Sequence, residues 1–231
     1  MSIFNWPPTL VPRHITIRPP RKTAGLTTSL TEFTQAVPVI RPPFDMTMEF
    51  DALTGSEILA WRAIMALAEG RTNPLRVPIF DMWFAATNAQ IGAGSVPHSD
   101  GAYFSDSAGY LTNDLVGVLV TGEQGQRHIT ADFGSYGQVL EAGLYFGLGD
   151  HPYIATGVTW AGSVATIRTS PTLRDDYVDQ PLRLRPVIVA RLKDDDAGDL
   201  RLQHMRYSTP TLDWVEAFVE PLSLRARAIS G

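Results

Sequence analysis

Histidine, serine and aspartate are the residue types in this sequence that could do chemistry. The tripeptide His98-Ser99-Asp100 holds all three members of a hydrolytic triad. A triad is assembled by the fold, however, and residues adjacent in sequence rarely point at one another. The sequence has no Gly-x-Ser-x-Gly turn, and Gly92-Ala-Gly94-Ser95 lacks the lysine and helix that complete a phosphate-binding loop. We therefore predict no catalytic residue and no enzymatic activity.

Metal ligands are the next candidates. No two of the five histidines have the i, i+4 spacing that presents two ligands on one helix face. Asp194, Asp195, Asp196 and Asp199 offer the carboxylates that Ca²⁺ prefers, but the EF-hand spacing and its terminal glutamate are absent. Cysteine is absent, which excludes disulfides, thiolate metal sites and cysteine nucleophiles. We predict a solvated aspartate turn between two strands, no metal ligand and no cofactor.

Composition sets wider limits. The 231 residues are 44% hydrophobic and 19% charged, which is typical of one large or two small globular domains. The net charge of −5 argues against sequence-specific nucleic-acid binding, which calls for a basic face. The sequence shows neither an apolar run of about 20 residues nor a signal-peptide pattern at its start. We therefore expect no membrane insertion.

The elements that would position any site begin with a proline-rich segment at residues 1–43, which contains eight of the 17 prolines. Proline fixes φ and removes a backbone donor, so this segment cannot be a helix or a central strand. We interpret it as an extended arm that lies either on its own domain or on a neighbouring subunit. Phe4, Trp6 and Leu10 are the possible interface anchors of this arm.

One helix is expected over residues 55–69. Thr54 and Glu57 fit a capping box, Gly70 suits the helix end, and apolar residues recur between them at helical spacing. Strands are expected at residues 46–52, 76–80, 115–120, 138–146, 153–160, 163–169 and 182–190, with a hairpin turn at Ala161-Gly162. These elements predict a mainly β fold, sandwich or barrel-like, with one principal α-helix (α+β by strict count). They would form a β-rich, ring-forming domain over residues 44–231, with a loop or insertion at about 88–111.

Several stretches of the sequence resemble tail proteins of long-tailed bacteriophages, and together they cover most of the chain outside about residues 90–111. Representative stretches are Trp6-Pro7-Pro8, Gly70-Arg71-Thr72-Asn73-Pro74, Gly149-Asp150-His151-Pro152-Tyr153 and Tyr207-Ser208-Thr209-Pro210. The family is that of the siphophage distal tail protein, or of a closely related baseplate ring protein. The resemblance implies a structural protein of the virion that forms a ring where the tail tube joins the tail tip.

The same resemblance implies the partners. They are copies of the chain itself in a ring of about six, the tail tube protein and the tip or hub proteins, assembled in the host cytoplasm into the phage tail. Two alternatives stay open. One is a receptor- or glycan-binding β-sandwich of a phage tail, with Trp83, Tyr103, Phe104 and Tyr110 as a stacking platform. The other is a hydrolase whose site is assembled from distant residues.

Overall fold

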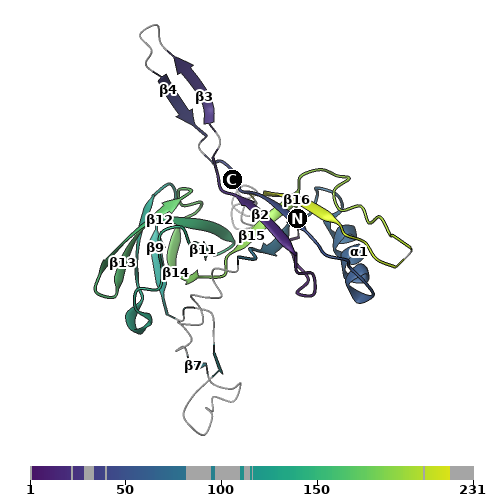
Figure 1. Cartoon of the computed structure of the whole chain (residues 1–231). Coiled ribbons are helices and arrows are strands. Elements are labelled where there is room, and N and C mark those ends of the chain that lie inside the picture. Colours follow the sequence, from purple (N-terminus) through teal and green to yellow (C-terminus); the bar gives the residue numbers. More distant parts are fainter. Residues whose placement is uncertain are drawn as a thin grey trace, which may run out of the picture. The chain divides into compact units, whose positions relative to one another are not determined.

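The computed structural model describes residues 2–21, 23–28, 34–39, 41–81, 95–96, 110–111, 115, 117–204 and 206–218. The chain forms two compact units (Figure 1). Unit 1 contains Met1–Thr16, Asp45–Arg76 and Val189–Gly231, and unit 2 contains Ile17–Phe44 and Val77–Ile188. This division differs from the expected arm over 1–43 followed by one domain over 44–231, because the proline-rich segment contributes residues to both units.

A six-stranded sheet with the order β1-β6-β15-β16-β5-β2 is the framework of unit 1. The strands are β1 (Phe4–Asn5), β2 (His14–Arg18), β5 (Asp45–Glu49), β6 (Leu75–Pro78), β15 (Val187–Leu192) and β16 (Thr211–Glu216). Both edge strands come from the proline-rich segment. Proline is tolerated at a sheet edge, where its missing N–H breaks no ladder. The segment is therefore strand-forming, as its composition allows, but only at the edges.

The predicted helix is confirmed as α1 (Ser56–Ala68). The Glu57 carboxylate accepts a hydrogen bond from the Thr54 N–H at 3.0 Å, which is one half of the capping box. The Thr54 side chain does not supply the other half. The helix ends where Glu69 and Gly70 both adopt positive φ, a conformation that glycine accepts without strain. Ile58, Trp61, Ile64 and Ala68 face the core of unit 1, as the helical spacing indicates.

The N-terminal residues also belong to the core of unit 1. The Trp6 ring lies 6.0 Å from the Phe50 ring and 5.7 Å, edge to face, from the Trp214 ring. The Phe50 ring in turn meets the Trp61 ring of α1 at 5.0 Å. The Trp61 indole N–H donates to the Gly198 carbonyl at 2.8 Å. Four aromatic side chains from four separate segments therefore pack together around one point.

Unit 2 is built on a second six-stranded sheet, of order β10-β13-β12-β11-β14-β9. Its strands are β9 (Leu119–Gly122), β10 (His128–Asp132), β11 (Tyr145–Leu148), β12 (His151–Ala161), β13 (Val164–Ser170) and β14 (Tyr177–Arg183). A short 3₁₀ helix, η1 (Gly134–Tyr136), follows β10. The sheet curls into a nearly closed barrel. Its interior is filled by large apolar side chains such as Phe146, Tyr153, Ile167, Leu182 and Leu184.

The predicted hairpin is confirmed as β12–β13, whose tight turn contains Gly162 with φ of 65°. Three other strand predictions need correction. In place of the strand expected at 115–120, the structure has β9 over Leu119–Gly122. Residues 138–144 form turns, in which Gly143 has φ of 100°, and only Tyr145–Leu148 pairs as a strand. The expected strand at 182–190 is two strands, because β14 ends at Arg183 and β15 begins at Val187, with Pro186 between them. Proline at that place offers no N–H to a ladder.

Two small strand pairs complete the described structure. They are β3 (Thr23–Thr28) with β4 (Thr34–Pro38), and β7 (Ser95–Val96) with β8 (Tyr110–Leu111). Strands account for 46% of the described residues and helix for 9%. The prediction of a mainly β, barrel-like fold with one principal helix is confirmed.

Candidate functional site: an exposed hairpin and the hollow at its base

The three predicted anchors of the N-terminal segment do not stand free for a neighbour. Trp6 is only 5% exposed and Leu10 is fully buried, and the Trp6 indole N–H donates to the Leu10 carbonyl at 2.7 Å. Phe4 lies in β1 and is half-buried. Trp6 and Leu10 therefore anchor the segment in unit 1 of their own chain. The interpretation of these two side chains as contacts to another subunit is corrected accordingly.

Several residues that were considered as site candidates in the sequence fall outside the described residues. They include His98-Ser99-Asp100, most of the loop at about 88–111, and Trp83, Tyr103 and Phe104 of the proposed stacking platform. Tyr110, the fourth member of that platform, lies in β8, which pairs with β7. The stacking platform therefore stays a prediction.

The aspartate turn is used for a local contact. The Asp195 carboxylate accepts a hydrogen bond from the Arg71 N–H at 3.1 Å, just beyond the end of α1. His14, His128, His151 and His204 lie in or beside different strands and turns. Across the described ranges, three or more potential metal-ligating side chains do not gather at any point.

A buried polar cluster in the barrel is structural in character. The hydroxyls of Tyr153 and Tyr177 lie 2.9 Å apart, and the Arg174 N–H donates to the Tyr153 oxygen at 2.8 Å. Burial, with the neighbouring Tyr153 hydroxyl, raises the pKa of the Tyr177 phenol far above its usual value. The Tyr177 phenol therefore stays neutral at ordinary pH. The cluster gives the buried hydroxyls of both tyrosines a hydrogen-bond partner.

The most unusual surface feature is the hairpin β3–β4 in unit 2. Its described residues carry no charge, and every described side chain of β3 and of residues 34–37 is exposed. Leu26 is 69% exposed and Val37 is 49% exposed. Leu26 stands opposite Ala36, whereas Val37 stands opposite Gly25. Because directly opposed residues share a face and successive residues alternate, Leu26 and Val37 lie on opposite faces of the hairpin.

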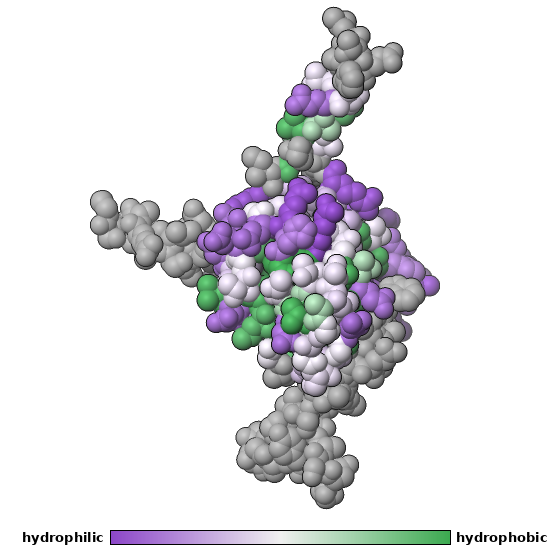
Figure 2. All heavy atoms as spheres, turned by 90° about the vertical axis from the view of Figure 1, so that its left-hand side faces the viewer, coloured by the Kyte–Doolittle hydropathy of each residue, from purple (hydrophilic) through white to green (hydrophobic). Residues whose placement is uncertain are grey.

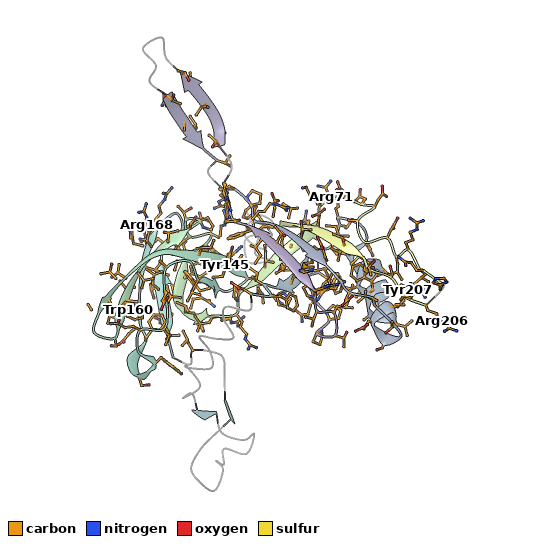
Figure 3. All side chains as sticks on the ribbon, in the orientation of Figure 1. Arg71, Tyr145, Trp160, Arg168, Arg206 and Tyr207 are labelled. Atoms are coloured by element: carbon orange, nitrogen blue, oxygen red, sulfur yellow. The ribbon has the colours of Figure 1, made fainter. Side chains whose placement is uncertain are left out.

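A hollow of about 420 Å³ lies at the base of this hairpin, entirely within unit 2. Pro20, Val39 and Pro42, which flank the hairpin, form one wall. The opposite wall comes from the barrel: Arg127, Thr156 of β12, and residues 168–172 at the end of β13. Figure 3 shows Arg168 at the rim of the barrel on the side of the hairpin. Sequence reasoning did not find this hollow, because no motif joins segments so far apart.

No protein-family model and no curated protein sequence matches this chain. Among the described residues, no helix is long and apolar enough to cross a membrane.

Proposed function

We propose that the protein is a structural component of a bacteriophage tail tip, a distal tail or baseplate ring protein. In this role copies of the chain associate into a ring that joins the tail tube to the tip complex. The resemblance of the sequence to siphophage tail proteins motivates the proposal. The observation that carries it is the uncharged hairpin β3–β4, which is exposed on both faces.

The hairpin lacks the support that two strands need. An isolated two-stranded hairpin is marginally stable in water, because it buries little apolar surface. Here the exposed apolar side chains Leu26 and Val37 point to opposite sides, so one covering surface could not bury both. A hairpin seated between two neighbouring molecules would bury both faces. We therefore assign the hairpin to contacts with another copy of the chain.

Ring closure needs a second, different face on each subunit, because cyclic contacts are heterologous. The outer surface of the barrel offers apolar candidates for this face. Val178 in β14 is 79% exposed and Leu119 in the neighbouring strand β9 is 43% exposed. In the side view of the molecule, hydrophobic residues are interspersed with neutral ones on the barrel surface (Figure 2). Such a mixed surface is typical of a non-obligate protein interface.

The test is the size of the full-length protein in solution, measured by light scattering and by electron microscopy of negatively stained particles. The wild type is expected to form rings of about six copies at high protein concentration. Leu26→Asp and Val37→Asp are expected to shift the protein to its 25.3 kDa monomer. Leu59→Asp is the matched control, because Leu59 is an equally exposed leucine (64%) on α1 of unit 1 and does not belong to the hairpin.

The outcomes separate the competing functions. A wild-type chain that stays monomeric at all concentrations contradicts the ring. Rings that persist unchanged in both hairpin variants contradict the role of the hairpin. A monomer that is retarded on a glycan matrix favours the receptor- or glycan-binding alternative, and turnover of a glycoside or ester substrate would favour the hydrolase.

A further inference from the structure

The hollow at the hairpin base carries a concentration of positive charge. Arg127 and Arg168 both line it, and none of the described lining residues is acidic. Within the described part of the chain, neither guanidinium has a carboxylate partner. His128 stands directly opposite Arg168 in the β10–β13 pair and is exposed. Figure 2 shows hydrophilic residues gathered on the barrel just below the hairpin.

The backbone that carries the two arginines is held in place by hydroxyl groups. The Thr156 hydroxyl donates to the Arg168 carbonyl at 3.0 Å. The Thr169 hydroxyl points to the Arg127 carbonyl at 3.4 Å, and the Thr169 N–H donates to the same carbonyl at 2.8 Å. Arg127 and Thr169 are thus cross-strand neighbours. The backbone at both arginines is therefore fixed to the barrel wall, and both residues line the hollow.

The opposite wall is also fixed. The buried Arg174 side chain donates to the Pro42 carbonyl at 2.6 Å, which ties the segment after the hairpin to the barrel. Pro20 and Pro42 restrict φ in both flanking segments. Ser170 and Thr172 add hydroxyl groups to the lining. The hollow is thus a preformed cleft with two arginines and two further hydroxyl donors.

The charge and the size of the hollow select one class of ligand. A phosphate monoester carries a charge of about −1.5 to −2 at neutral pH and three strong acceptor oxygens. Two guanidiniums match that charge, and each can donate two parallel hydrogen bonds. A carboxylate carries a single negative charge and would leave one arginine uncompensated. A volume of about 420 Å³ lies within the range of small-molecule sites.

We propose that the hollow between the hairpin base and the barrel binds a phosphate monoester through Arg127 and Arg168. This site is separate from the exposed hairpin faces and does not depend on ring formation. It gives unit 2 a ligand-binding role in addition to a structural one.

The test is isothermal titration of the full-length protein, with glucose 6-phosphate, inorganic phosphate, gluconate and glucose as probes. Glucose 6-phosphate is expected to bind at low ionic strength, and gluconate and glucose are expected to give no measurable heat. Tighter binding of glucose 6-phosphate than of inorganic phosphate identifies an organic monoester as the ligand. Equal binding of the two identifies free phosphate. Both results support the site.

Arg127→Gln and Arg168→Gln are each expected to weaken glucose 6-phosphate binding by about tenfold or more, since each removes a charge-assisted contact. Arg183→Gln is the matched control, because Arg183 is an exposed arginine at the end of β14 and does not line the hollow. Circular dichroism should show all three variants folded, because the side chains are exposed. The proposal is overturned by equal affinity in all three variants, by gluconate binding as tight as that of the phosphate ester, or by no binding of either phosphate probe.

Discussion

Replacement of Trp6 by alanine tests whether the N-terminal segment belongs to the core of unit 1. Trp6 is 5% exposed, so the variant removes almost an entire buried indole. A tryptophan buries about 150–250 Å², and at about 25 cal/mol per Å² this corresponds to about 4–6 kcal/mol. Comparable core truncations cost about 3–5 kcal/mol. We therefore expect Trp6→Ala to lower the free energy of unfolding by about 3–5 kcal/mol.

The assay is a thermal melt followed by near-ultraviolet circular dichroism, which reports on packed aromatic rings. A loss of about 3–5 kcal/mol should lower the melting temperature by about 6–20 °C for a chain of this length. Thr9→Ala is the control, because Thr9 is exposed in the same segment. If Trp6→Ala melts within a degree of Thr9→Ala, the indole is not packed against Phe50 and Trp214 and the assignment of the N-terminus to the core is refuted.

Trp6→Phe separates packing from hydrogen bonding. Phenylalanine keeps most of the apolar contact but leaves the buried Leu10 carbonyl without the indole N–H that it accepts at 2.7 Å. An unsatisfied buried acceptor costs about 1–3 kcal/mol. The phenylalanine variant should therefore melt between the wild type and Trp6→Ala. Both variants lose the indole N–H, so a Trp6→Phe variant that melts no higher than Trp6→Ala would contradict packing of the ring against Phe50 and Trp214.

Two further predictions concern the pH dependence of stability and a backbone position. The pKa of Tyr177 is raised in the folded state, so its contribution to stability is complete below the unfolded pKa of about 10 and is lost as the pH rises above it. In denaturant unfolding above pH 10, the free energy of unfolding should therefore fall less steeply with pH for Tyr177→Phe than for the wild type. Gly198→Ala should lower the melting temperature, because Gly198 has φ of 89° and an added methyl group would lie 2.9 Å from Leu212 Cδ2 and collide with Met65. Ala197→Ser is the control, and equal melting temperatures of the two variants would contradict this reason.

The local elements could be predicted because their signals lie within a few residues. The helix α1 follows from Glu57, the apolar spacing and Gly70, all of which act over one or two turns. The hairpin β12–β13 follows from two β-branched runs around Gly162. The strand expected at 138–146 is confined to Tyr145–Leu148, because Gly143 with φ of 100° interrupts the extended backbone before it, which hydrophobicity alone does not reveal.

The candidate site could be predicted only in fragments. The alternation of β13 already indicates that Arg168 points outward, since Ala165, Ile167 and Thr169 are the buried positions. Nothing in the sequence indicates that Arg127 and the flanks of the hairpin face the same hollow. The threonines and apolar residues of the hairpin likewise do not indicate that both of its faces are exposed.

The sequence by itself determined the mainly β class, the helix α1 and the placement of the prolines of residues 1–43 in edge strands and connections, because these depend on φ restriction and on side-chain periodicity. Only the tertiary structure decided where the N-terminal segment lies. In the sequence, Trp6 could pack on its own domain or on a neighbouring subunit. In the structure it belongs to the core, because its ring packs against Phe50 and Trp214 and its N–H donates to the Leu10 carbonyl. Contacts between distant segments are set by the packing of the whole chain, and no local pattern encodes them.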